Sequence, residues 1–286
     1  MQISPHLLTI SLLCASTILQ AAERPGYSGR LIDCHMHTGN WEYHWSTDDL
    51  APILRKEGIT FALVSALESP PSTQVAANNA VLAEVAKHPD LFGALAWAHP
   101  LENGWREDLE RTLRAGRCYG IKIHPARYQY KLDSFPAILR GVFEVARAHR
   151  LPIVTHTDEQ YSPPKNFLPL IEEFRDVTLV LYHSYPMIDS ISIAATHPNV
   201  YLDNSWIADS PEFVLVAVRA LGSRRVLYGT DAPVSFEWNP TKPLPPGRLF
   251  FARPIDYISG LPLTQKQKED IFFRNAERVF HIQTKR

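Results

Sequence analysis

The sequence has few cysteines, no excess of positive charge and no long apolar run, and each absence excludes a class of protein. Its 286 residues include three cysteines, too few for a disulfide framework and not spaced as in a zinc ribbon. Basic and acidic side chains nearly balance, 29 against 30, so we expect no nucleic-acid partner. With 45% hydrophobic and 21% charged residues, the composition is that of a folded globular protein.

The apolar stretch at residues 7–19 is too short to span a bilayer, and we predict no membrane span. Its length suits the hydrophobic region of a signal peptide, although no Lys or Arg precedes it and Gln20 fits poorly before a cleavage after Ala22. Residues 1–22 are therefore expected to be a signal peptide, which would place the protein in the periplasm or outside the cell. The alternative is an N-terminal extension from an upstream start codon, which would leave the protein cytoplasmic.

From Arg30 onward, short apolar runs alternate with amphipathic stretches. Near-continuous apolar runs are typical of parallel strands covered on both faces, and strict alternation with helical periods indicates βα units. Eight such units in about 250 residues predict a single-domain (β/α)8 TIM barrel over residues 30–282. No GxGxxG motif follows the first strand, which weakens the dinucleotide-binding alternative. The predicted strands lie at 31–37, 59–67, 92–99, 118–125, 151–157, 178–184, 199–205 and 225–233.

Capping residues set the limits of several predicted helices. Ser46 can cap a helix that ends at Gly58, and the chain closes with a helix over 264–280. The segment 232–262 is rich in proline and aromatic residues. We predict that it forms a loop after the eighth strand, on the C-terminal face of the barrel.

Metal-capable side chains stand where the predicted strands end, which is where TIM barrels carry their chemistry. His35 and His37 are two residues apart on the first strand, so they share one face and can chelate one ion. Imidazoles and carboxylates suit Zn²⁺, Mn²⁺, Fe²⁺ or Ni²⁺ better than Ca²⁺ or Cu(I). The other polar groups at strand ends are Lys122, His124, His156, His183 and Asp231.

Six motifs carry a resemblance to a known family. In chain order they are IDCHMH (32–37), GIKIHP (120–125), VTHT (154–157), LYHS (181–184), YGTDAP (228–233) and NAERVF (275–280). With these motifs the chain resembles the amidohydrolase superfamily, in particular the amidohydrolase-related (amidohydrolase 2) branch of TIM-barrel metal-dependent hydrolases and decarboxylases. The motifs are specific for the superfamily and much less specific for a substrate.

The resemblance implies a metal centre with one or two divalent ions per chain, zinc first. His35, His37 and Asp231 would hold one ion. His156 would be a further ligand, either to that ion or to a second ion shared with His183. In one-metal members, His183 would instead serve as an acid–base or substrate-orienting group.

Lys122 occupies the position where two-metal members place a bridging ligand, often a lysine carboxylated by CO2. A protonated ammonium cannot bind a metal, so this role requires carboxylation or deprotonation. The alternatives are an inward-facing lysine paired with Asp33 and a lysine paired with a substrate carboxylate.

Five further residues are candidates for contact with a small-molecule substrate. Arg127 could hold an anionic substrate group. The alternative is a structural hydrogen bond for His124, a loop-turn element for Trp97 and His99, and a solvated or packed loop residue for Arg127 and Trp206. The candidates are Trp97, His99, His124, Arg127 and Trp206.

The leading hypothesis is a hydrolase that cleaves an amide, ester or lactone by metal-activated water, with Asp231 as general base. The first alternative is a one-metal, non-oxidative decarboxylase of an aromatic or unsaturated carboxylic acid, with His183 as acid or base. A metal-independent lactonase and a barrel that only binds are two further alternatives. We expect a homodimer on general grounds.

Overall fold

The computed structural model describes residues 27–40, 44–67, 72–205, 212–233 and 248–283. Eight parallel strands lie in chain order around a barrel, and a short strand, β2 (His44–Trp45), pairs antiparallel with the end of the first. The eight are β1 (Leu31–Asn40), β3 (Ile59–Ala66), β4 (Phe92–Trp97), β5 (Cys118–Ile123), β6 (Ile153–His156), β7 (Leu179–Tyr182), β8 (Val200–Asp203) and β9 (Val226–Leu227). The predicted (β/α)8 barrel is confirmed.

The barrel closes between β1 and the residues that follow β9. The amide of Cys34 donates to the carbonyl of Tyr228 at 3.0 Å, and the amide of Asp231 donates to the carbonyl of His35 at 2.7 Å. A third bond, from His37 to Ala232 at 2.8 Å, completes the seam. The last strand is thus joined to the first by main-chain bonds that run in both directions.

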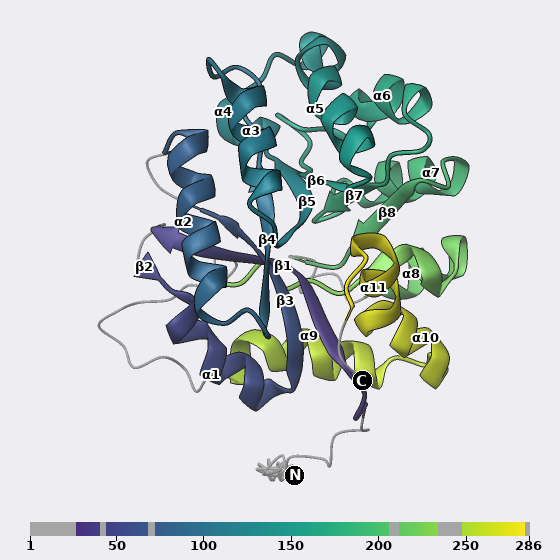
Figure 1. Cartoon of the computed structure of the whole chain (residues 1–286). Helices are drawn as coiled ribbons and strands as arrows, with labels where there is room; N and C mark the ends of the chain where they lie inside the picture. Colours follow the sequence, from purple (N-terminus) through teal and green to yellow (C-terminus); the bar gives the residue numbers. More distant parts are fainter. Residues whose placement is uncertain (1–26, 41–43, 68–71, 206–211, 234–247, 284–286) are drawn as a thin grey trace, which may run out of the picture.

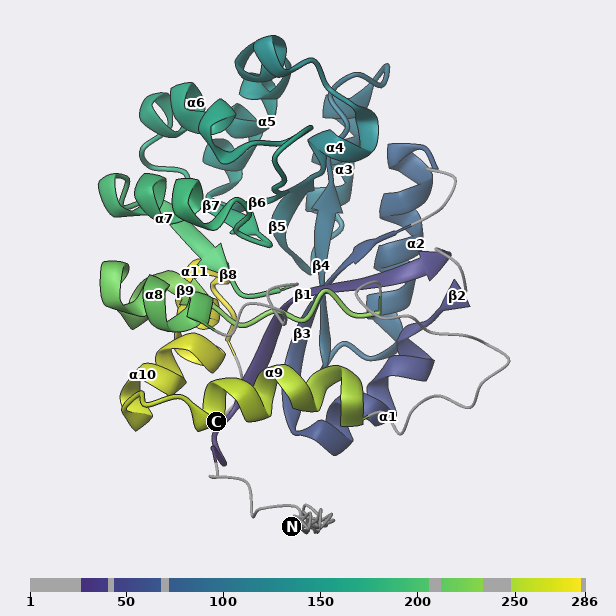
Figure 2. The ribbon, with the colours of Figure 1, turned by 180° about the vertical axis from the view of Figure 1, so that it is seen from behind.

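Helices surround the strands on the outside (Figures 1 and 2). Those that follow the first seven barrel strands are α1 (Thr47–Glu57), α2 (Gln74–Lys87), α3 (Trp105–Arg114), α5 (Phe135–His149), α6 (Leu168–Glu173), α7 (Met187–Thr196) and α8 (Glu212–Leu221). A short helix, α4 (Pro125–Tyr128), directly follows β5. None of the helices in the described ranges has the length and apolar character that a membrane crossing requires.

Local sequence explains the predicted helix limits. Ser46 and Asp49 form a capping box at the start of α1, and Gly58 ends that helix with a left-handed φ of 80°. The predicted helix 264–280 starts with a second capping box at Thr264. It then runs as α10 (Gln265–Glu269), a π-helical turn η5 (Asp270–Arg274) and α11 (Asn275–Phe280).

The predicted loop over 232–262 contains a helix, α9 (Arg248–Gly260), which lies beside α1 (Figure 1). The prediction of a loop was therefore wrong for this part. Ile255, Ile258 and Leu261 are spaced by three residues and are buried, so one apolar helix face outweighs the loop-forming content of the segment. Residues 234–247 lie outside the described ranges.

Besides the apolar core that joins strands and helices, a second apolar core fills the barrel near its N-terminal end. Early residues of the strands, such as Ile32, Val154 and Val180, point inward and are fully buried. Phe273 and Phe280 of the C-terminal helical segment pack against them. The barrel is thereby closed at this end, which leaves the ends of the strands at the other side for polar groups.

Candidate active site and metal centre

Three strand ends bring together one group of potential metal ligands. Ligand atoms of His35, His183 and Asp231 all lie within 4.8 Å of one another, and the three side chains are buried. They come from β1, from the residue after β7 and from the segment after β9. No other such group of His, Cys, Asp and Glu occurs in the described part of the chain.

His37 adjoins this group through Asp231. The Nε2 atoms of His35 and His37 lie 3.2 and 3.0 Å from the same oxygen, Oδ1 of Asp231. The predicted common face of the two histidines is therefore present. The register of β1 is irregular between Asp33 and Met36. This irregularity explains why Cys34 and His35 both point into the barrel although they are adjacent in the strand.

Two of the three residues have an unusual main-chain conformation. His183 has a φ of 66° and Asp231 a φ of 58°, both in the left-handed region that L-residues seldom adopt. Such conformations persist only where the surroundings fix them, and they are common at functional sites. Here they turn the chain sharply at the strand ends and direct both side chains to the group.

Burial makes the histidines of the group neutral. It lowers the pKa of His35 well below its ordinary value and lowers the pKa of His183 to about 3. Burial alone would raise the pKa of Asp231, but the hydrogen bond with His37 and the electrostatic attraction of His183, His37 and Lys122 lower it overall. The result is a set of neutral imidazoles around a carboxylate.

This donor set fits a divalent cation. The Nε2 atom of His35 is buried and makes no hydrogen bond to any described residue, although Asp231 Oδ1 is 3.2 Å away. A neutral imidazole nitrogen in that state offers a lone pair to a metal ion. Zn²⁺, Mn²⁺, Fe²⁺ and Ni²⁺ accept imidazole and carboxylate ligands of this kind.

His156 and His124 form the adjoining part of the site. Their rings stack with centroids 4.2 Å apart, and the His156 ring lies 4.7 Å from that of His183. The Nε2 atom of His156, however, faces Asp158 Oδ2 at 3.2 Å. The structure thus places His156 beside the ligand group, and its role as a ligand stays a prediction.

Lys122 lies on the floor of the site. Its Nζ atom is 4.3 Å from the centroid of the Tyr182 ring, on which His35 also stacks at 3.6 Å. Burial lowers the pKa of Lys122 to about 7, although the charges of Asp231 and Asp203 raise it. Asp33, one of the partners considered for this lysine, instead accepts a hydrogen bond from Thr230 Oγ1 at 2.6 Å.

The predicted substrate contacts gather on the side of β4 and β5. Trp97 is buried and donates from Nε1 to the hydroxyl of Tyr128 at 2.6 Å. The ring of His99 stacks on Tyr128 at 3.5 Å. The main-chain amide of Arg127 donates to Nδ1 of His124 at 3.2 Å. Trp206 lies outside the described residues, and the substrate role of all five stays a prediction.

Several residues of the site were missed by sequence reasoning. Asp203 Oδ2 lies 3.1 Å from His35 Nδ1, and Ser205 Oγ lies 2.8 Å from the same nitrogen. Asp203 is the last residue of β8 and Ser205 follows it by two residues, so the rule used for the other strand ends would have found them. Tyr182 and Asp158 gave no such signal, because the contacts that place them become visible only in three dimensions.

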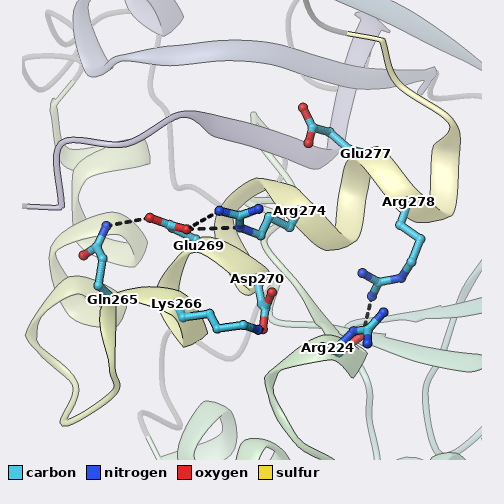
Figure 3. Close-up of a pocket in the computed structure, with 8 residues that line it drawn as sticks. All are labelled: Arg224, Gln265, Lys266, Glu269, Asp270, Arg274, Glu277 and Arg278. Carbon is cyan, nitrogen blue, oxygen red and sulfur yellow. Dashed lines mark hydrogen bonds and ion pairs between the residues drawn. The ribbon is translucent and has the colours of Figure 1, made fainter. Parts of the chain in front are cut away.

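Figure 3 shows a hollow at the N-terminal end of the strands, opposite the candidate metal centre. It adjoins a short turn, η4 (Ser223–Arg225), that directly precedes β9, and its volume is about 880 Å³. Arg274 pairs with Glu269 at 2.7 Å and Lys266 with Asp270 at 3.3 Å. Since most of its charges are already neutralised, we assign no ligand to it. It is lined by Arg224, Gln265, Lys266, Glu269, Asp270, Arg274, Glu277 and Arg278.

Comparison with known proteins shows the family to which the chain belongs. The sequence profile of the amidohydrolase family matches residues 32–282, and the chain belongs to that family. It is thus an enzyme of the amidohydrolase superfamily with a TIM-barrel fold. No curated protein matches the sequence.

Among solved structures, the chain is similar to a zinc-bound amidohydrolase from Burkholderia multivorans, with a TM-score of 0.69, 12% identity, and coverage of 89% of this chain and 100% of that one. It is also similar to 2,6-dihydroxybenzoate decarboxylase in complex with 2,6-dihydroxybenzoate, with a TM-score of 0.68, 14% identity, and coverage of 88% of this chain and 99% of that one. A third similar structure is a D314N mutant of 5-carboxyvanillate decarboxylase from Novosphingobium aromaticivorans with bound manganese. Its TM-score is 0.65 and its identity 14%, and the match covers 90% of this chain and 98% of that one. At these identities, the likeness establishes the fold.

Proposed function

We propose that the protein is a metal-dependent, non-oxidative decarboxylase of an aromatic or unsaturated carboxylic acid. The observation that carries this proposal is the single group of ligand atoms, from His35, His183 and Asp231, in the described part of the chain. One group corresponds to one ion, which suffices for decarboxylation. Two of the similar solved structures are decarboxylases of benzoates, which supports the same choice.

The ion is proposed to be zinc, with manganese as the first alternative, because similar structures hold one or the other. His35, His37 and Asp231 would hold it, with His156 or His183 as a further ligand. A divalent ion supplies positive charge that attracts substrate oxygens and stabilises the negative charge that develops on the substrate.

The side chains around this group suit a carboxylic acid. Lys122 is a buried amine at the floor of the site, and Arg127 stands at the rim, so both can orient a carboxylate. His99 and Tyr128, which stack and are partly exposed, offer aromatic surface for a planar substrate near His124 and the buried Trp97. The reaction breaks the bond between the ring carbon and the carboxylate, releases CO2 and forms a C–H bond with a proton from the enzyme.

Two histidines are candidates for the proton donor. His183 takes this role if His156 completes the metal centre. Because its pKa of about 3 leaves it neutral, it must first take up the proton that it delivers. His156, hydrogen-bonded to Asp158, takes it if His183 is the ligand. Comparing His183→Asn with His156→Asn separates the two, because the ligand variant loses metal and turnover together, whereas the proton-donor variant keeps the metal and loses turnover.

The test of the proposal is CO2 release from hydroxybenzoates and unsaturated carboxylic acids by protein loaded with Zn²⁺ or Mn²⁺. We expect release that depends on the metal and is abolished in Asp231→Asn. Metal-dependent hydrolysis of amides, esters or lactones, without CO2 release from any acid of the panel, would contradict it.

A metal-dependent hydrolase remains the second candidate because of one observation. Lys122 has a pKa near 7, so part of the amine is neutral and able to react with CO2 to form a carbamate ligand. Asp231 would then act as the general base on the attacking water. Two ions per chain in wild type, falling to one or none in Lys122→Ala, would support this candidate, whereas one ion in both proteins would contradict it.

We also propose, from the sequence, that the protein is exported and forms a homodimer. N-terminal sequencing of the mature protein tests the first point, since removal of about 22 residues requires a processed leader. Sedimentation equilibrium tests the second.

A further inference from the structure

A fully buried carboxylate, Asp203, links two histidines of the proposed metal centre. Its Oδ2 lies 3.1 Å from Nδ1 of His35. Its Oδ1 accepts from the main-chain amide of His183 at 2.7 Å, and from the hydroxyl of Ser205 at 2.7 Å. One side chain thus contacts the ring of one histidine and the main chain of another.

The directions of these bonds determine the proton position on His35. Oδ2 of ionised Asp203 can only accept a hydrogen bond, so Nδ1 of His35, 3.1 Å away, must carry the ring proton. Ser205 Oγ lies 2.7 Å from Asp203 Oδ1, 2.8 Å from His35 Nδ1 and 3.3 Å from His183 Nδ1. When its single proton goes to Asp203, its oxygen is a second acceptor for His35 Nδ1. Nε2 is then left without a proton and faces Asp231.

Close packing supports this arrangement. A Cβ on Gly229 would lie 2.5 Å from Asp203 Oδ2 and 2.8 Å from the Cβ of His35. A glycine at this position in the YGTDAP motif is thus what allows Asp203 to approach His35. His183 has a left-handed φ of 66°, and its main-chain amide donates a hydrogen bond to the same carboxylate, which holds this turn.

We infer that Asp203 is a positioning residue of the metal centre: together with Ser205 it fixes the Nδ1–H tautomer of His35, and it holds the turn that presents His183. The inference rests on the proposed metal centre and not on the reaction. A carboxylate that accepts from the outer ring nitrogen of a metal-binding histidine sets the orientation and basicity of that ring.

The chain offers an informative pair of variants. In Asp203→Asn, the amide oxygen would take the place of Oδ1, toward which three donors point: the amides of His183 and Ser205 and the Ser205 hydroxyl. The amide NH2 would then face His35 Nδ1 and move the ring proton to Nε2. Asp33→Asn is the matched control, since Asp33 is equally buried but contacts Thr230 and the main-chain amide of His35 rather than a ring nitrogen.

The experiment is ¹⁵N NMR of histidine-labelled, metal-free protein at pH 8, with the His35 signals assigned by their loss in His35→Gln. We expect Nδ1–H in the wild type and in Asp33→Asn, and Nε2–H in Asp203→Asn. Zn²⁺ affinity, measured by chelator competition, should fall about 10–100-fold in Asp203→Asn. Ser205→Ala should keep the tautomer, because Oδ2 of Asp203 still accepts.

An Nε2–H tautomer of His35 in the wild type would overturn the inference, whether or not Asp203→Asn folds. So would an Asp203→Asn protein that keeps both the Nδ1–H tautomer and wild-type zinc affinity. Lack of decarboxylase activity would not change these spectra, so the two proposals fail separately.

Discussion

The two ends of the barrel use the same eight strands but opposite kinds of side chain. At the N-terminal end, apolar residues such as Val154 and Val180 pack against Phe280 of the last helix. At the C-terminal end, the same strands β6 and β7 lead into His156 and His183. Burial stabilises the fold at the first end. At the second end it opposes charge, as the pKa of about 3 for His183 indicates. The interior of the barrel thus has an apolar end that contributes to stability and a polar end that carries the candidate chemistry.

A change at the polar end of the barrel should have the largest effect: Asp231→Asn is expected to lose its metal. An amide lacks the charge that the ligand group requires, so zinc affinity should fall by more than the roughly 100-fold that loss of an outer partner can cost. Elemental analysis of purified protein measures this. Unfolding by urea should change little, and a variant that retained one ion per chain would argue against Asp231 as a ligand.

Phe280→Ala is the converse change at the apolar end. Phe280 is 1% exposed and packs inside the barrel, so its truncation should lower the free energy of unfolding by about 3–5 kcal/mol. Urea denaturation monitored by circular dichroism measures the loss. Metal content per folded chain should equal that of the wild type. A matching loss of metal would mean that the two ends are coupled.

Gly229→Ala tests the polar end by packing alone. The added methyl group would press on Asp203 and His35, at a cost of about 1–3 kcal/mol, with weaker zinc binding. Gly260→Ala is the control, because nothing lies within 4 Å of a Cβ at that position. Thermal unfolding and chelator competition on both variants should separate them. Equal behaviour would show that the close approach at Gly229 has no consequence.

The smallest effect is expected at the hydrogen bonds that connect helices α2 and α3 with the end of strand β4. Asp108 accepts from Gln74 at 2.8 Å and from Asn78, which also donates to the carbonyl of Trp97. Asp108→Asn should cost about 0.5–1 kcal/mol at pH 7.

This cost should depend on pH. Burial raises the pKa of Asp108, but the hydrogen bonds from Gln74, Arg111 and Asn78 outweigh it and hold the pKa below its ordinary value. The ionised form therefore stabilises the fold above about pH 4, and this contribution is lost as the pH falls through the lowered pKa. The stability difference between wild type and variant should shrink from pH 6 to pH 3, as urea denaturation can measure. A constant difference would contradict this cause.

The barrel and the gathering of His35, His37, His183 and Asp231 could be predicted because they follow from alternation along the chain and from strand ends meeting at one rim. The orientation of His156 could not, since a rotamer decides whether its Nε2 faces the ligand group or Asp158. Helix α9 was missed because Pro254 lies inside it, and a proline within a periodic pattern usually indicates that a helix ends. Asp203 ends β8, so the strand-end rule marks its position, but its contact with His35 on β1 is visible only in the folded barrel.

The seam between β1 and the segment after β9 has a consequence for the order of folding. Asp231 is 194 residues from His37 in the chain, and it reaches that histidine only when the last strand docks on the first. The ligand group therefore does not exist in any partly folded chain that lacks this final contact. Divalent ions that bind the full group would favour the closed barrel by mass action, so metal supply would act on the stability of the closed form as well as on catalysis.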